Sequence, residues 1–133
     1  VIGEDENSHV IYNTVAEDLI FSGDDFYLIS LFQNLLDNAQ KYSPDGSEIN
    51  IYSESNSSKI IICISDQGVG IAEDEKTKIF DRFYRIEDEE TRSSKGTGLG
   101  LFLVNQIVKM HGGKIICKNN TPRGSIFELH FKK

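Results

Sequence analysis

The chain has 133 residues, of which 38% are hydrophobic and 26% are charged, and its formal net charge is −7. Such a length and composition are typical of one globular domain that buries a core without metal or disulfide staples. The negative charge argues against nucleic acid as a partner, because that needs basic surface to displace counterions from phosphates. No apolar run approaches the roughly 20 residues that span a bilayer, so we expect no membrane contact by this fragment.

The first residue is Val1 rather than Met, and no signal-peptide pattern follows, so we interpret the chain as a piece of a longer protein. Cys63 and Cys117 lie inside runs of β-branched residues, where a thiol behaves as a small buried hydrophobe. We expect two reduced core cysteines in a cytoplasmic protein rather than a disulfide or a metal pair.

The first third of the chain is predicted to form two strands and a helix. Residues 1–8 are polar and acidic like a linker end, and the domain is predicted over residues 9–133. Short apolar runs predict strands at 9–12 and 19–21, and residues 22–25 predict a turn with a helix N-cap. A helix is predicted over 25–42, because apolar residues recur there at helical spacing, and Pro44 ends it. The core-facing positions are Leu28, Leu31, Leu35, Ala39 and Tyr42.

The rest of the chain mixes hairpins with helices. Strands are predicted at 48–53 and 59–66, a short helix at 73–82 and a mobile loop at 85–95. An apolar helix follows at 98–111, closed by Gly112 and Gly113, and strands at 114–119 and 125–131 finish the chain. This order favours an α+β fold, a two-layer α/β sandwich, over a doubly wound parallel sheet.

Four short patches stand in one order: residues 34–42 (NLLDNAQKY), 66–70 (DQGVG), 80–83 (FDRF) and 96–100 (GTGLG). Together they resemble the N, G1, F and G2 boxes of the ATP-binding catalytic domain of sensor histidine kinases, a branch of the gyrase, Hsp90 and MutL ATPases. The resemblance covers residues 10–131. It implies the Bergerat ATP-binding fold, in which three helices cover a mixed, mostly antiparallel sheet and a mobile ATP lid spans about 81–97.

Asn34, Asn38 and Lys41 are spaced 4 and 3 apart, so they share one face of the predicted helix. Helix physics alone slightly favours a solvated face there. The resemblance implies instead that all three bind the cofactor, with Asn38 coordinating Mg²⁺ and Lys41 contacting phosphate as the catalytic residues, and that Tyr42 lies against the base. An amide oxygen suits Mg²⁺, which takes few protein ligands when phosphates supply the others.

Asp66 ends the most buried predicted strand and runs into Gly68 and Gly70. This pattern is typical either of a turn or of a hydrogen-bond acceptor with backbone room for a ligand. The resemblance implies that Asp66 accepts the adenine amino hydrogen and rejects guanine, and that the two glycines let the ring approach. It also implies that the Ser125 hydroxyl reaches adenine through water.

The glycine-rich patch at 96–100 enters the apolar helix, where free backbone amides and the helix dipole favour phosphate. It matches neither a P-loop nor a Rossmann turn. The resemblance implies that the whole patch binds the nucleotide and that Arg82 and Arg85 pair with phosphate, although a surface arginine is the commoner case. The residues expected in the patch are Gly96, Thr97, Gly98, Leu99 and Gly100.

The position of Asn34 bears on the reaction. In Hsp90-like ATPases a glutamate one helical turn before the metal-binding asparagine activates water, and an amide cannot serve as that base. Phosphoryl transfer to a protein side chain is therefore favoured over hydrolysis. The three histidines, His9, His111 and His130, lack the context of a phospho-accepting histidine and are all interpreted as surface residues.

We therefore expect an ATP-dependent protein histidine kinase domain with ATP and Mg²⁺ as cofactors. Its acceptor histidine would lie on a separate dimerisation segment of the parent protein, and a response regulator would receive the phosphate. Many such parents cross a membrane. Two alternatives stay open, a non-catalytic nucleotide-binding or docking module and an anti-sigma-type serine kinase or stand-alone ATPase. The four complete patches argue against the first alternative, and Asn34 with the Phe80 patch argues against the second.

Overall fold

One mixed sheet organises the molecule. The computed structural model describes residues 3–4, 9–16, 23–82, 84 and 100–133. Within them, β2 and β3 pair in parallel, and the other neighbouring strands pair antiparallel. The predicted α+β class with a mixed, mostly antiparallel sheet is confirmed. The strands, in spatial order, are β1 (Gly3–Glu4), β2 (Val10–Asn13), β3 (Glu48–Ser55), β4 (Lys59–Ser65), β6 (Ser125–Lys132) and β5 (Lys114–Asn119).

The chain before α1 differs in detail from the sequence-based expectation. β1 lies within the segment that was expected to be a linker end, and it pairs with β2 through Gly3 opposite Ile11. The strand predicted at 19–21 lies outside the described residues. None of the described helices is long and apolar enough to cross a membrane.

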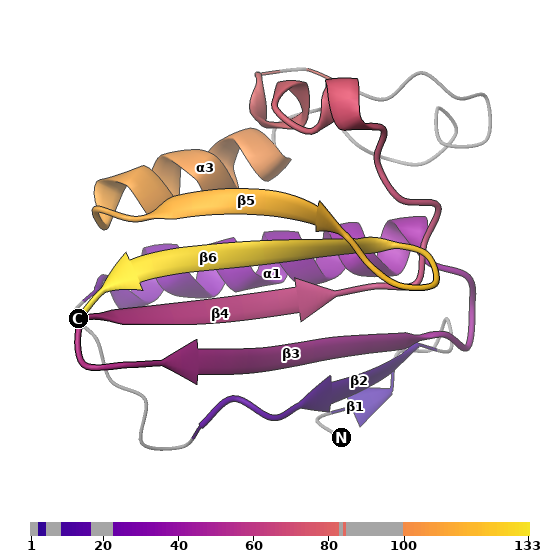
Figure 1. The fold of residues 1–133 in the computed structure, drawn as a ribbon, viewed down its shortest axis with the longest axis horizontal. Coiled ribbons are helices and arrows are strands. Elements are labelled where there is room, and N and C mark those ends of the chain that lie inside the picture. The colour runs from indigo at the N-terminus through magenta and orange to yellow at the C-terminus, as the bar shows by residue number, and fades with distance from the viewer. Residues whose placement is uncertain (1–2, 5–8, 17–22, 83, 85–99) are drawn as a thin grey trace.

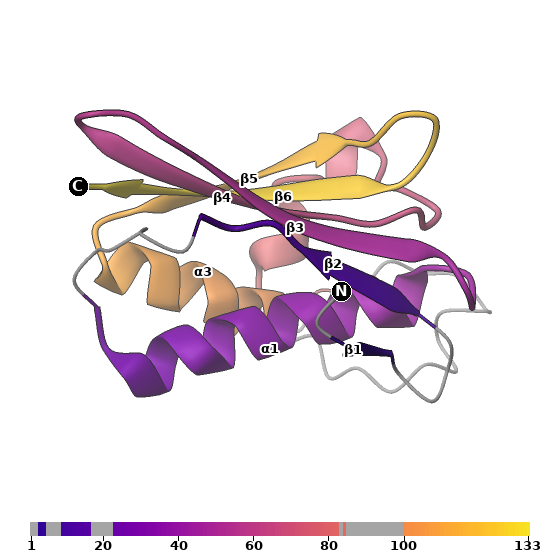
Figure 2. The same ribbon diagram turned by 90° about the horizontal axis from the view of Figure 1, so that it is seen from below.

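Two α-helices, α1 (Asp25–Tyr42) and α3 (Gly100–Met110), lie side by side on the same face of the sheet (Figures 1 and 2). They run in opposite directions. The backbone amide of Asp24, just before α1, donates a hydrogen bond of 3.1 Å to Nε2 of His111, just after α3. The C-terminal half of α1 consequently lies toward the beginning of α3.

The helix ends have the capping chemistry that the sequence predicts. Asp24 accepts a hydrogen bond from the Tyr27 amide through Oδ1 at 3.2 Å, as an N-cap does. At the end of α3, Gly112 has a φ of +73°, and the Gly113 amide bonds the Val108 carbonyl at 2.9 Å. This arrangement is a Schellman motif, in which glycine adopts the left-handed conformation at little steric expense.

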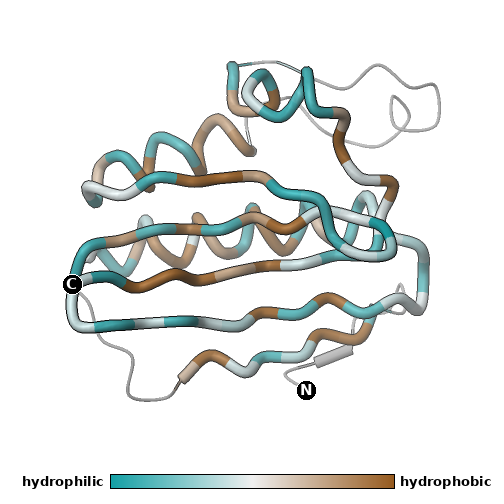
Figure 3. Tube along the Cα trace, viewed as in Figure 1, coloured by the Kyte–Doolittle hydropathy of each residue, from teal (hydrophilic) through white to brown (hydrophobic). Residues whose placement is uncertain are grey.

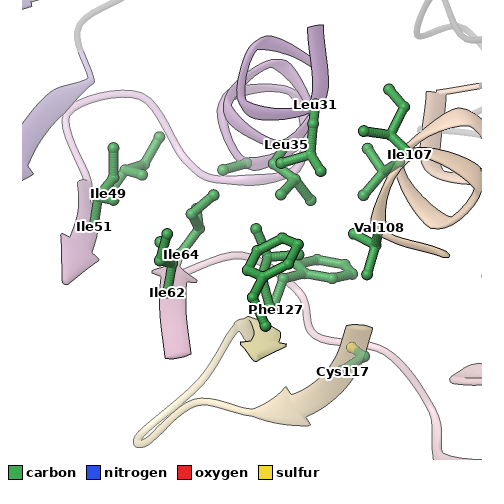
Figure 4. Packing of buried hydrophobic residues seen from close by; sticks show 14 of the residues in the cluster. Leu31, Leu35, Ile49, Ile51, Ile62, Ile64, Ile107, Val108, Cys117 and Phe127 are labelled. Atoms are coloured by element: carbon green, nitrogen blue, oxygen red, sulfur yellow. The ribbon is translucent and has the colours of Figure 1, made fainter. Parts of the chain in front are cut away.

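The core lies between the helices and the sheet, as Figure 4 shows. Hydrophobic and polar residues alternate along both helices in Figure 3, so each helix turns an apolar stripe toward the strands. Leu31 and Leu35 of α1 and Val108 of α3 are fully buried. Each such side chain contributes about 1.5–3 kcal/mol relative to an exposed one. They pack with a set of sheet residues that includes Ile49, Ile51, Ile62, Ile64, Phe127 and Leu129.

The prediction of one continuous short helix over 73–82 is wrong. Two 3₁₀ turns stand there instead, η1 (Glu73–Glu75) and η2 (Lys78–Phe80), held by hydrogen bonds such as that from the Asp81 amide to the Lys78 carbonyl. Ile79 is the one buried residue of these two turns. A single anchor does not compensate for the nucleation cost of an α-helix, so the segment forms isolated turns.

Both cysteines are buried and free, as predicted. Cys117 belongs to the core beneath the helices, whereas strand alternation turns Cys63, between Ile62 and Ile64, to the opposite face of the sheet. Burial raises the pKa of each thiol to about 11. The thiols are therefore protonated and unreactive at neutral pH.

Candidate functional site

The buried carboxyl group of Asp66, immediately after β4, is the centre of the candidate site. It is 4% exposed, and Oδ1 accepts hydrogen bonds from the amides of Gly68 at 2.9 Å and Ser125 at 3.1 Å. Burial raises the pKa of the Asp66 carboxyl, and the bonds from the two amides oppose that rise. Both bonds end on Oδ1, so the second oxygen, Oδ2, has no hydrogen-bond partner among the described residues.

The loop after Asp66 lies against the end of α1. A Cβ atom at Gly68 would stand 2.4 Å from the Tyr42 carbonyl oxygen, a distance that no side chain tolerates. Gly70 has a φ of +78°, in the left-handed region that favours glycine. The protein's own backbone therefore requires both glycines, in addition to the room for a base that the resemblance implies.

The polar face of α1 meets the start of α3. The Asn34 amide donates to the Ser30 carbonyl at 2.8 Å, and its Oδ1 lies 3.3 Å from the place of a Cβ atom at Gly100. Asn34 and Asn38 are half-buried, while Lys41 is exposed with Nζ 5.8 Å from the centre of the Tyr42 ring. Of the side chains expected in this patch, Asn34 thus lies beside the beginning of α3, while Lys41 and Tyr42 lie at the end of α1.

Of the segment between η2 and α3, the structure describes residues 81, 82 and 84. Arg85, Gly96, Thr97, Gly98 and Leu99 lie outside the described residues, as does most of the expected lid. Arg82 is exposed, and its guanidinium lies 4.9 Å from the centre of the Phe102 ring on α3, a cation–π contact. Arg82 is thereby directed toward α3.

Two residues of the turn between β5 and β6 contact the Asp66 loop, and sequence reasoning did not find them. Asn120 donates from Nδ2 to the Asp66 carbonyl at 2.8 Å, and Arg123 donates from Nε to the Gly68 carbonyl at 3.0 Å. More than 50 residues separate these partners along the chain. The sequence signals only a turn here, so the pairing could not be derived without the sheet order.

The expectation that all three histidines lie at the surface is wrong for His9. Its ring is 2% exposed, and Nε2 lies 3.1 Å from the carbonyl oxygen of Ser43, the residue that follows α1. His111 and His130 are half-buried, and Nε2 of His130 contacts a carboxylate oxygen of Glu128 at 3.0 Å. His9 stands just before a strand, and only the parallel pairing of β2 with β3 brings it beneath the end of α1.

Solved structures have the same fold. The nucleotide-free catalytic domain of histidine kinase ThkA matches with a TM-score of 0.80 and 31% identity, covering 96% of this chain and 81% of that one. The mycobacterial sensor histidine kinase MprB matches with a TM-score of 0.80 and 30% identity, covering 93% of this chain and 81% of that one. The fold is thus that of histidine kinase ATPase domains.

The family follows from the sequence. Residues 23–133 match the family described as Histidine kinase-, DNA gyrase B-, and HSP90-like ATPase, and this chain belongs to it. The sensor protein SrrB of Staphylococcus aureus (strain NCTC 8325 / PS 47) is 42% identical over 100 residues, which are 75% of this chain and 17% of that protein. The chain therefore spans a small part of the curated relative, and it is a histidine kinase-type ATPase domain of the kind found in sensor kinases.

Replacing Gly124 by alanine is predicted to destabilise the site more than the same change at Gly112. Both glycines have positive φ, at +105° and +73°. A Cβ atom at Gly124 would stand 2.0 Å from the Asp66 carbonyl oxygen, whereas nothing lies within 4 Å at Gly112. We expect Gly124→Ala to lose about 1–3 kcal/mol more free energy of unfolding than Gly112→Ala, as in overpacking. Urea denaturation measures both losses. If the two variants lost equal free energy of unfolding, the close contact between Gly124 and the Asp66 carbonyl would be contradicted.

Proposed function

We propose that this domain binds Mg-ATP and transfers the γ-phosphate to a histidine on a separate dimerisation segment of its parent sensor kinase. The observation that carries the proposal is the Asp66 carboxylate, buried and fixed through Oδ1 by two backbone amides. A buried acceptor whose second oxygen has no partner in the part of the chain that the structure describes is suited to select a ligand that brings a donor. The reading as a sensor kinase is supported by the SrrB, ThkA and MprB relatives.

Base selection follows from the chemistry of Oδ2. The exocyclic amino group of adenine donates a hydrogen bond, and guanine carries a carbonyl oxygen at the same position. Guanine would set an acceptor against a buried carboxylate and leave both without a partner, which strongly disfavours binding. Gly68 and Ser125 contact the carboxylate, Tyr42 lies beside Gly68 and Gly70 lies beside Gly124, so the base would occupy this corner.

The phosphates would lie between the polar face of α1 and the start of α3. The positive end of the α3 dipole favours anions near Gly100, and Lys41, Arg82 and Arg85 are the expected phosphate partners, with residues 96–99 as further contacts. Asn38 fits Mg²⁺, because it offers a neutral amide oxygen on the half-buried face of α1, one turn from Asn34. Bound Mg²⁺ would neutralise phosphate charge as the phosphoryl group leaves.

Transfer is favoured over hydrolysis at this site. The side-chain amide of Asn34 donates a hydrogen bond to the Ser30 carbonyl, and an amide has no basic group that could activate water. The acceptor would be the parent's dimerisation segment, and a response regulator would take the phosphate from it. ATP as the donor places the domain in the cytoplasm in this proposal, whatever the topology of the parent.

Asp66→Asn is predicted to weaken the preference for adenine over guanine nucleotides. The amide keeps the shape of the carboxyl and an oxygen for the two backbone donors, but puts a donor where Oδ2 stood. We expect ATP affinity to fall roughly 10- to 100-fold, as for a hydrogen bond to a charged group, and the GTP:ATP affinity ratio to rise. Calorimetric titration of both nucleotides measures this, with Asp45→Asn in an exposed turn as the matched control. An unchanged ATP preference would argue against Asp66 as the selector.

Asn38→Ala is predicted to remove most of the Mg²⁺ dependence of ATP binding. The change deletes the proposed metal ligand without altering the base corner, so affinity for ATP in EDTA should stay within about twofold of the wild type. Titrations with and without Mg²⁺ test this. Asp37→Ala, an exposed neighbour on the same helix, should keep the full dependence, and a Mg²⁺ effect that survives in Asn38→Ala would refute the assignment.

The phosphorylated product distinguishes a histidine kinase from the alternatives. Incubated with labelled ATP and the dimerisation segment of its parent, the domain should form a phosphoprotein that is labile in acid and stable in alkali, as a phosphohistidine is. Asn38→Ala should abolish the label. An acid-stable phosphoprotein would favour a serine kinase, and ATP binding without label would favour a non-catalytic module.

A further inference from the structure

The turn between β5 and β6 is fastened to the loop that carries Asp66. The Asn120 side-chain amide donates to the backbone carbonyl of Asp66, and the Arg123 guanidinium donates to that of Gly68. These two carbonyls stand on either side of Gln67. The first part of the loop is therefore held from outside at two points, one on each side of Gln67.

The turn is itself held in shape. The backbone amide of Asn120 donates to the Gly124 carbonyl at 2.9 Å, and its Oδ1 accepts from the Thr121 amide at 2.9 Å. Gly124 presses on the Asp66 carbonyl so closely that a Cβ atom would stand at 2.0 Å. Because turn and loop are locked to each other, a shift of Asn120 or Arg123 is transmitted to the Asp66 backbone.

We propose that Asn120 and Arg123 are positioning residues that aim the Asp66 carboxylate and so determine the preference for 6-amino over 6-oxo purine nucleotides. The inference rests on the proposed function, since it needs Asp66 to contact the base. Neither residue contacts the base in this account. They act by holding the two carbonyls of the loop, because a specific hydrogen-bonding site works only when its acceptor is held within about 0.5 Å.

A purely structural role for Asn120 and Arg123 would give a different experimental result. If the turn only stabilised the β5–β6 hairpin, its loss would lower the thermal midpoint and leave the preference between bases unchanged. A positioning role instead changes the ratio of the affinities for ATP and inosine triphosphate, which carries an oxo group in place of the 6-amino group of the purine and a hydrogen on the adjacent N1. The ratio also cancels any change in net charge, because both nucleotides carry the same triphosphate.

The test uses Asn120→Asp and Arg123→Ala, with Thr121→Ala as the control. Asn120→Asp keeps the shape of the side chain but cannot donate, and Arg123→Ala removes the guanidinium of an exposed residue. Thr121 is exposed in the same turn. By calorimetry we expect the ATP preference over inosine triphosphate to fall roughly three- to tenfold in both variants, the effect of a weakened hydrogen bond, and to stay unchanged in Thr121→Ala.

The outcomes separate this inference from the proposed function. If Asp66→Asn changes the base preference but both turn variants keep the wild-type ratio, the inference fails and the function stands. If the wild type binds no ATP, both fail. Thermal melts check that each variant is folded. If Asn120→Asp is unfolded, the ATP to inosine triphosphate ratio of Arg123→Ala alone tests the inference. Arg123 is exposed, so its replacement by alanine is expected to leave the fold intact.

Discussion

One carboxylate oxygen joins the end of β4 to the start of its neighbour β6, where the candidate site lies. Oδ1 of Asp66 accepts the amide of Gly68 in its own loop and the amide of Ser125 at the start of β6. β4 and β6 pair along their whole shared length, so this joint is fixed by the sheet rather than by a flexible loop. The carboxylate is thereby held in one orientation, and its other oxygen has no hydrogen-bond partner among the described residues.

The antiparallel packing of α1 and α3 places the start of α3 beside the polar face of α1. The start of α1 is tied to the end of α3 through His111, and the start of α3 consequently lies beside the middle of α1, where Gly100 faces Asn34. The close approach of Gly68 to Tyr42 then sets the Asp66 loop against α1. The end of α1 thus lies against the loop that follows β4, and the positive end of the α3 dipole lies further back along α1, beside Asn34 on its polar face.

Local patterns allowed most of the fold to be predicted, and long-range contacts account for what was missed. The N-cap at Asp24 and the glycine cap at Gly112 depend on neighbouring residues, so the sequence revealed both. The burial of His9 depends on a parallel strand pair, and the contacts of Asn120 and Arg123 depend on the order of strands, which no local pattern records. The sequence of the 73–82 segment does not show that Ile79 is the one buried residue of η1 and η2, so a continuous helix could not be distinguished there from two separate turns.

The central claim is that nucleotide binds at the Asp66 corner between the ends of α1 and β4. The most direct test is to add Mg-ATP to isotope-labelled domain and follow the backbone amide resonances. The account predicts large shifts at Gly68, Gly70 and Ser125 and in the last turn of α1, and none at Asn56 in the distant β3–β4 turn. Binding of ATP with unshifted resonances at Gly68 and Ser125 would contradict it.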